Sequence, residues 1–141
     1  MLKNIDPLLT ADLLAILRSM GHGDTLALVD RNFPAAGNAK RLVDLSGARL
    51  DAVATAVLSV LPIDTFEEPA VFRMGVVGEP AAVLPVHVEF QGILTAAEGR
   101  DVAMSVLDRF AFYERARSAY AVVYTGDERP YGCFIVTKGV V

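Results

Sequence analysis

Polar residues that interrupt otherwise apolar segments are the first candidates for chemistry in this 141-residue chain. The stretch MGHGD, residues 20–24, places His22 between two glycines. An imidazole exchanges protons in either direction near neutral pH, and glycines leave room for a ligand beside the ring. His22 is therefore a candidate acid or base. The alternative is a histidine that caps the preceding helix or faces solvent.

Five further polar residues fall at predicted strand ends and turns: Asp30, Asp64, Arg109, Tyr113 and Tyr131. Carboxylates, a guanidinium and phenols that converge on a cleft would suit a polyhydroxylated ligand, whose hydroxyls need directed donors and acceptors. Each residue also has a structural explanation. The two aspartates could hold turns, Arg109 could lie on a solvated helix face, and Tyr113 could belong to the core.

Neither the cysteine nor the histidines indicate a metal site. The single cysteine, Cys133, cannot form an internal disulfide and has no histidine near it in the sequence, so it is expected to be a small packed residue. His22 and His87 lie too far apart for a zinc motif, and phosphate-binding glycine motifs are absent. We expect no metal, nucleotide or other cofactor.

Composition and charge exclude several classes of protein. The net charge is −4 and the basic residues are scattered, which argues against a nucleic-acid surface. No apolar run approaches the roughly 18 residues of a membrane span, and the N-terminus does not resemble a signal peptide, so we expect a cytoplasmic protein. The apolar fraction of 53% suggests surface buried between subunits.

Helices and apolar strands alternate in the first two thirds of the sequence. Thr10 is positioned to cap a helix, Gly21 suits the left-handed residue that ends it, and a strand at 25–29 leads to Asp30. Later segments predict a helix from Leu50 to Leu61, a strand at 70–77 and a helix from Pro85 to about Ala97, with His87 off its apolar face.

The remaining sequence predicts a strand at 102–107, a helix at 109–116, and two strands between Tyr120 and Lys138 joined by a turn. We expect those two strands to form an antiparallel hairpin, which would make the sheet mixed. The whole chain, 1–141, then forms a single α/β domain with helices packed on a mostly buried sheet.

Six blocks of the sequence, in order, resemble the RbsD/FucU family of sugar mutarotases, and specifically its L-fucose mutarotase branch. The blocks are MLKNIDPLL at the start, MGHGD, Asp30 with NFPA, LPIDTF at 61–66, RFAFYERA at 109–116, and TG followed by YG and KGV near the end. The resemblance covers essentially the whole chain.

The resemblance implies a three-layer α/β/α fold around a mixed sheet and a cofactor-independent interconversion of the anomers of L-fucose or a similar aldose. It also implies a ring-shaped homo-oligomer, commonly a decamer, with sites where subunits meet. Matched by motif position, His22, Asp64 and Tyr113 would be catalytic, whereas Asp30, Arg109 and Tyr131 would bind the sugar.

One position departs from the family pattern, because Cys133 stands where the family usually has asparagine. A thiol is a weaker hydrogen-bond partner than a carboxamide, so a contact to the sugar could be lost or the preference altered. A non-catalytic sugar-binding or scaffold oligomer is therefore an alternative. A second alternative is the pyranose/furanose interconversion of the family's ribose branch.

Overall fold

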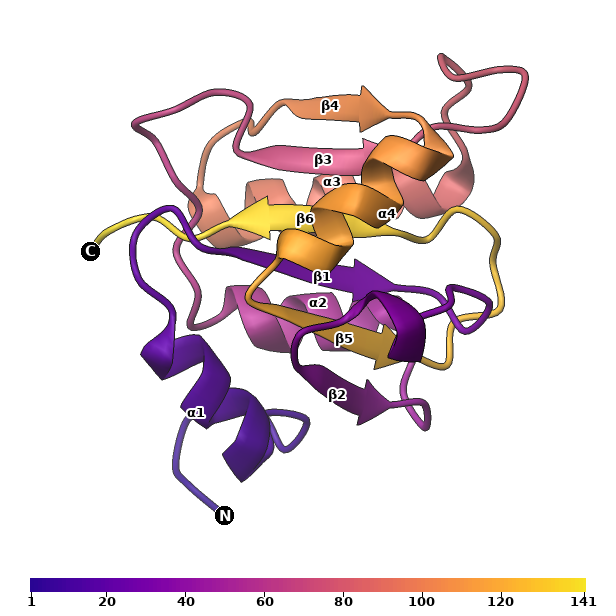
Figure 1. The fold of residues 1–141 in the computed structure, drawn as a ribbon. Helices are drawn as coiled ribbons and strands as arrows, with labels where there is room; N and C mark the ends of the chain where they lie inside the picture. Colours follow the sequence, from indigo (N-terminus) through magenta and orange to yellow (C-terminus); the bar gives the residue numbers. More distant parts are fainter.

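A six-stranded mixed sheet forms the centre of the computed structural model, which describes residues 1–141 (Figure 1). The strands are β1 (Thr25–Val29), β2 (Leu42–Leu45), β3 (Val71–Met74), β4 (Met104–Leu107), β5 (Ala121–Thr125) and β6 (Phe134–Thr137). The helices are α1 (Ala11–Ser19), α2 (Leu50–Leu58), α3 (Pro85–Glu98) and α4 (Arg109–Ser118), with a short 3₁₀ helix, η1 (Ala36–Asn38).

The strands follow one another across the sheet in the order β2-β5-β1-β6-β3-β4. β1 runs parallel to β5 and antiparallel to β6, and β6 is in turn antiparallel to β3. Five strands therefore point the same way and only β6 opposes them. We call the edge at which these five strands end, beside Asp30 and Asp108, the carboxyl edge, and the edge at which they begin, beside Thr25, the amino edge.

The predicted antiparallel hairpin between the last two strands is wrong, although the mixed sheet is confirmed. β1 lies between β5 and β6, pairing Leu26 with Ala121 on one side and with Val136 on the other. The segment 126–133 is consequently not a tight turn. It crosses the carboxyl end of β1 and brings Cys133 to Asp30.

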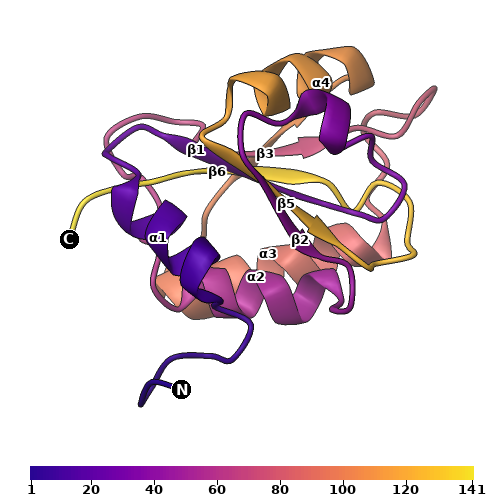
Figure 2. The same ribbon diagram turned by 60° about the horizontal axis from the view of Figure 1, so that its bottom comes forward.

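Helices cover both faces of the sheet, which confirms the three-layer arrangement (Figure 2). Leu26 and Leu28 of β1 belong to the core under α1, α2 and α3, whereas Ala27 and Val29 belong to the core under α4. Because successive side chains of a strand point to opposite faces, a strand covered on both sides must be apolar throughout. This explains the uninterrupted run at 25–29.

All four predicted helices are present, although α2 ends at Leu58 and not at Leu61. The Thr10 hydroxyl accepts a hydrogen bond from the Leu13 N–H at the start of α1, and Asp108 does the same for Ala111 in α4. β3 ends at Met74 rather than at 77, because the chain turns between Val76 and Glu79. His87 was expected off the apolar face of its helix, yet it is 1% exposed.

Candidate active site

His22 lies in a tight loop between α1 and β1 at the amino edge. The helix ends through an extended Met20, and the N–H of Gly21 donates to the Asp24 carboxylate at 2.7 Å. The left-handed residue is Gly23, with φ of 87°, and not Gly21 as expected. Met20 is already extended, so the chain leaves the helix before the loop turns back. The positive φ therefore falls at Gly23, two residues after Gly21.

The imidazole of His22 is hydrogen-bonded to a buried carboxylate. Its Nε2 lies 3.0 Å from Oδ1 of Asp64, and the side chains are 45% and 3% exposed respectively. Backbone N–H groups of Phe66 and Glu67 also donate to Asp64. The Phe66 N–H and, to a smaller extent, His22 hold the pKa of the Asp64 carboxyl below its ordinary value, although burial opposes them.

This arrangement fixes which ring nitrogen is available. Asp64 is ionised near neutral pH and only accepts, so Nε2 of a neutral His22 is the donor and Nδ1 carries the free lone pair. The Phe66 ring lies against the imidazole with centroids 5.2 Å apart. His22 is thus an oriented, half-exposed imidazole whose charged form a neighbouring carboxylate stabilises.

The end of the chain positions both members of this pair. The Gly23 N–H donates to the Lys138 carbonyl, and the Lys138 N–H donates to the Asp24 carbonyl. The Lys138 ammonium donates to carbonyls of Leu17 and Met20 at the end of α1. The Asp64 N–H donates to Thr137, the neighbour of Lys138. Residues 137–138 therefore hold the two loops in register.

Asp30 and Cys133 form a second pair, at the carboxyl edge. Oδ1 of Asp30 accepts from the N–H groups of Asn32 and Phe33, and the Cys133 thiol donates to Oδ2 at 3.3 Å. Asp30 is 4% exposed and Cys133 2%. Burial raises the pKa of the Asp30 carboxyl and raises that of the Cys133 thiol well above its ordinary value.

The other predicted residues lie at the same edge. The Tyr113 ring packs edge-on against Phe33, with centroids 5.2 Å apart, so this side chain does partly belong to the core. Arg109 is the first residue of α4, is exposed, and lies over the Phe110 ring. The Tyr131 hydroxyl accepts from the Val77 N–H at 3.2 Å.

The predicted site residues therefore form two groups within one chain. His22 and Asp64 lie at the amino edge, whereas Asp30, Cys133, Tyr131, Tyr113 and Arg109 lie at the carboxyl edge. The five residues of β1 separate the edges by about 13 Å along the strand, at roughly 3.3 Å per residue. The two groups do not converge on one cleft of a single chain.

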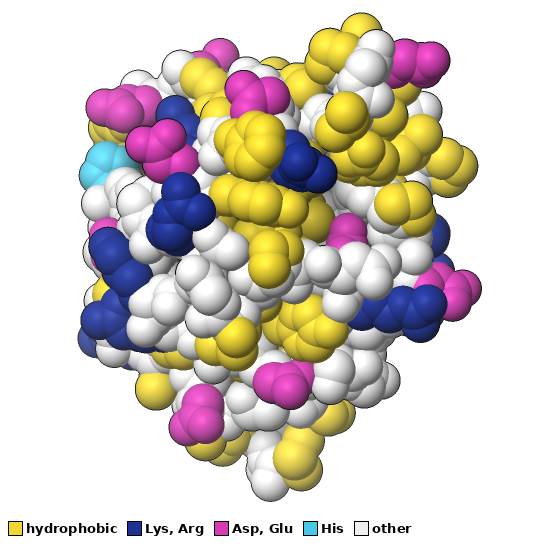
Figure 3. Space-filling model, turned by 45° about the vertical axis from the view of Figure 1, so that its right-hand side comes forward, with side chains coloured by type: hydrophobic (Ala, Val, Ile, Leu, Met, Phe, Trp, Pro, Cys, Tyr) yellow, Lys and Arg dark blue, Asp and Glu magenta, His cyan; other side chains and the backbone are white.

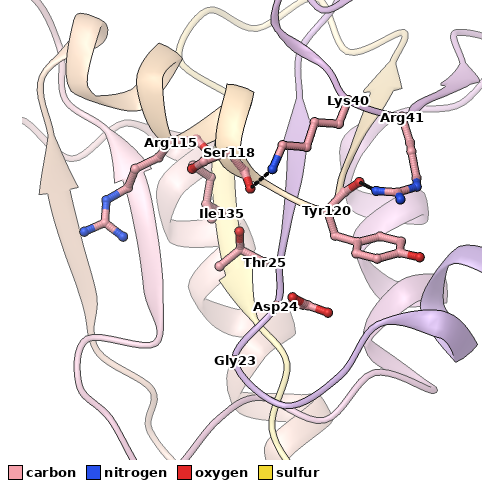
Figure 4. Close-up of a pocket in the computed structure, with 9 residues that line it drawn as sticks. All are labelled: Gly23, Asp24, Thr25, Lys40, Arg41, Arg115, Ser118, Tyr120 and Ile135. Atoms are coloured by element: carbon pink, nitrogen blue, oxygen red, sulfur yellow. Dashed lines mark hydrogen bonds between the residues drawn. The ribbon is translucent and has the colours of Figure 1, made fainter.

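A polar cavity of about 320 Å³ adjoins the His22 loop at the amino edge (Figure 4). Its basic residues already serve the fold: Lys40 donates to the Ser118 carbonyl, Arg41 donates to the Tyr120 carbonyl, and Arg115 lies over the Phe72 ring. The carbonyl of Ser118 is that of the last residue of α4 and the carbonyl of Tyr120 lies just beyond it, so these cations lie near the negative end of the helix dipole. Figure 4 shows the three charged groups spread apart rather than aimed at one point.

An apolar hollow of about 440 Å³ lies at the carboxyl edge, between the turn after β3 and the start of α4. Val77 and Phe110, which line it, are 64% and 69% exposed. Figure 3 shows apolar side chains gathered on this side of the molecule. An uncovered apolar surface next to Arg109 and Tyr131 is typical of a site for a ligand or a partner.

Comparison with known proteins decides the family. The model of the RbsD / FucU transport protein family matches residues 3–141. The chain belongs to this family. The RbsD/FucU relatives include an L-fucose mutarotase from Histophilus somni, 39% identical over 140 residues, which cover 99% of this chain and 97% of the relative.

Solved structures of RbsD/FucU type superpose closely on the chain. A putative sugar binding protein, Atu2016, is 49% identical, with a TM-score of 0.95 over 100% of this chain and 97% of the other. The fucose mutarotase of Streptococcus pneumoniae, solved in complex with L-fucose, is 33% identical, with a TM-score of 0.92 over 99% of each chain.

The structure contains no group of three or more His, Cys, Asp or Glu side chains that could hold a metal ion. None of its helices is both long and apolar enough to cross a membrane.

Sequence reasoning about this RbsD/FucU chain missed two residues that organise the site. Lys138 links the His22 and Asp64 loops, but nothing in its local sequence predicts a role, because its partners lie far away in the chain. His87 is buried beneath the loop that carries Tyr131. The sequence does contain a signal for His87. It stands two residues after Pro85, in the first turn of a predicted helix, where a side chain can reach back to the N-cap.

Proposed function

We propose that this chain is a cofactor-independent sugar mutarotase that interconverts the α and β anomers of L-fucose or a similar aldose. Membership of the RbsD/FucU family and the fucose mutarotases among its relatives support the reaction class. The observation that carries the mechanism is the hydrogen bond between His22 and Asp64, which leaves Nδ1 of an oriented imidazole free to exchange a proton.

Anomer exchange needs one proton removed and one delivered. The anomeric hydroxyl loses its proton while the ring oxygen gains one, the pyranose opens, and the aldehyde turns and closes again. His22 exchanges a proton with the sugar, and the ionised Asp64 stabilises the imidazolium that forms. We assign Tyr113 to assist proton transfer. Its ring packs against Phe33, whose N–H donates to the Asp30 carboxylate, so the phenol lies close to Asp30.

The sugar's remaining hydroxyls need directed partners at the carboxyl edge. Asp30 offers acceptor oxygens, Arg109 offers exposed N–H donors, and the Tyr131 phenol can donate because its oxygen already accepts from Val77. The Cys133 thiol occupies one lone pair of Asp30 and so shapes how the carboxylate meets the sugar. We assign these four residues to substrate binding.

We propose that a complete site needs two copies of the chain. One copy supplies the amino edge with His22 and Asp64, and the next supplies the carboxyl edge. The Phe66 side chain beside His22 is 68% exposed, and Phe110 at the other edge is 69% exposed, so each edge offers apolar surface to cover. Two different faces in contact make a heterologous interface, which closes into a ring when the rotation from one copy to the next divides a full turn. We propose a decameric homo-oligomer of this kind.

The single cysteine of the chain is buried and unpaired, as suits a reducing compartment, and we propose a cytoplasmic location.

Saturation-transfer NMR on the α and β anomers of L-fucose tests the proposed reaction directly. Saturating one anomeric proton in the presence of the protein should diminish the signal of the other far faster than in buffer. Parallel measurements with D-ribose separate anomer exchange on fucose from pyranose/furanose interconversion. Exchange at the buffer rate for every aldose tried would reject the proposal.

A sugar-binding protein without turnover is the second candidate, favoured by the thiol bonded to Asp30 where the family pattern has a carboxamide. Saturable binding of L-fucose together with exchange at the uncatalysed rate would establish it. Accelerated exchange excludes it.

A further inference from the structure

His87 joins the start of α3 to the loop that carries Tyr131. Its Nδ1 accepts from the Leu84 N–H at 3.0 Å, and its Nε2 lies 3.1 Å from the Tyr131 carbonyl. A backbone N–H can only donate and a carbonyl can only accept, so the tautomer is determined. Nε2 carries the proton, and the neutral ring uses both nitrogens.

The backbone of Tyr131 needs such an anchor. Its φ is 63°, a left-handed conformation that costs energy for a residue with a side chain. The next residue, Gly132, leaves no spare room, because a Cβ there would lie 3.3 Å from the Arg129 carbonyl. The His87 bond to the Tyr131 carbonyl therefore restrains the segment from which the phenol projects.

The other end of the Tyr131 side chain is also held, by the segment between β3 and α3. The Val77 N–H in that segment donates to the phenol oxygen, and Arg73 donates to the Ala82 carbonyl at 3.2 Å. Arg73 is 5% exposed and its Nη1 has no partner. Burial, and then the charge of Arg73, lower the pKa of His87, which favours the neutral ring.

We propose that His87 is a positioning residue that sets the place of the Tyr131 phenol at the sugar-binding edge, acting through its hydrogen bond to the Tyr131 carbonyl. The role rests on the proposed function, in which Tyr131 contacts a sugar hydroxyl. His87 itself is buried and touches no substrate.

Three substitutions separate the two bonds of the imidazole. In His87→Gln the amide nitrogen lies as many bonds from the backbone as Nε2 does, so it can donate to Tyr131, and a glutamine at this position can also accept from the Leu84 N–H at the N-cap. In His87→Asn the amide oxygen takes the place of Nδ1 and serves Leu84, but nothing reaches Tyr131. His87→Phe fills the volume and makes neither bond. Val88→Asn, at the exposed neighbouring position, controls for asparagine in this turn.

The expected readout is a change in KM for L-fucose at nearly constant kcat, because a displaced phenol weakens binding in the ground and transition states alike. His87→Asn and His87→Phe should raise KM about fivefold, the scale of one hydrogen bond, whereas His87→Gln should stay within about twofold of the parent protein. A purely structural role would instead lower the folded fraction, and hence apparent kcat, with KM unchanged. That result would overturn the proposal.

Two further measurements complete the test. In a Tyr131→Phe background, His87→Asn should raise KM no further, and additive effects would contradict the proposal. The NMR chemical shift of the Val77 amide reports the position of the Tyr131 phenol, to which this amide donates, and needs no activity assay. It should change in His87→Asn and in Tyr131→Phe but not in His87→Gln. An unchanged Val77 shift in His87→Asn overturns the positioning role, whereas a parent protein without exchange overturns only the proposed function.

Discussion

His22 and Asp64 are joined by a 3.0 Å hydrogen bond across 42 positions of sequence, and both belong to loops that the end of the chain holds together. The carboxylate is 3% exposed and the imidazole 45%. A buried, ionised acceptor behind a half-exposed ring is an arrangement that orients a base and stabilises its protonated form.

Removing the imidazole should abolish most of the rate. His22→Ala is expected to slow anomer exchange about 100-fold or more, because general acid and base catalysis is lost. Asp64→Asn should slow it about tenfold, since the amide keeps an acceptor oxygen but not the charge. Saturation-transfer NMR measures both, with the exposed Asp12→Asn as a control. Exchange at the parent rate in His22→Ala would refute the assignment.

Two inactive variants should regain anomer exchange when they are mixed, because in a shared site each supplies the group that the other lacks. His22→Ala lacks the amino-edge group and Asp30→Ala lacks a carboxyl-edge group. In rings reassembled from equal amounts, about one quarter of the contacts pair an intact amino edge with an intact carboxyl edge. Exchange should recover to about that fraction of the parent rate. Hybrid rings with no recovered activity would show that one chain supplies both groups.

Asp127 should make the stability of the fold sensitive to acid. Its carboxylate accepts from Arg129 and from the Leu50 N–H at the start of α2, and these bonds, led by Arg129, lower its pKa from 3.8 to about 2. Because the pKa is lower in the folded protein, the ionised carboxylate stabilises the fold at pH values above about 4. This stabilisation is lost as the pH falls toward 2 and the carboxylate is protonated. The lowered pKa of Asp127 contributes about 2 kcal/mol to the free energy of unfolding near pH 7.

Asp127→Asn should therefore unfold more easily near pH 7, and its free energy of unfolding should fall less steeply between pH 4 and pH 2 than that of the parent protein. Urea titrations across this pH range measure both effects, and the exposed Asp101→Asn serves as the control. Identical slopes for Asp127→Asn and the parent would contradict the role of this carboxylate.

A methyl group at Gly139 should displace Asp64 and so disturb its hydrogen bond to His22. A Cβ there would lie 2.7 Å from the Ile63 carbonyl oxygen and 2.9 Å from the Asp64 backbone. Since backbone atoms must move, Gly139→Ala should destabilise the protein by about 1–3 kcal/mol and slow anomer exchange. Gly37→Ala, where the methyl group meets nothing within 4 Å, is the matched control. Unchanged exchange in Gly139→Ala would separate this contact from the active site.

Cys133 should resist thiol reagents in the native protein. It is 2% exposed, and burial followed by the Asp30 charge raises the pKa of the thiol well above its ordinary value. Iodoacetamide at pH 8 should label the native chain far more slowly than the chain in denaturant, as mass spectrometry can measure. Equal labelling rates would show that the thiol is accessible.

Local patterns in the sequence were sufficient to predict the presence of the four helices and most strands, but not where β3 and α2 end. Thr10 and Asp108 cap their helices through their own side chains, and the run at 25–29 is apolar because both faces of β1 are covered. These signals lie within a few residues of the structure they specify.

The arrangement of the strands could not be predicted in the same way. A short connection between Tyr120 and Lys138 resembles a hairpin, but β1 pairs with both flanking strands and separates them. The order and direction of the strands then decide which distant residues share an edge, bringing Asp64 to His22 and Cys133 to Asp30. The burial of His87 likewise depends on Tyr131, which lies 44 positions later.

The place of β6 has a consequence for how the protein is made. It is the last strand along the chain, yet it alone joins the β2-β5-β1 half of the sheet to the β3-β4 half. During synthesis the two halves cannot unite until β6 has left the ribosome, so the sheet closes only after the other five strands have been made. Truncating the chain before Phe134 would leave two open half-sheets with exposed edges, which are prone to aggregate.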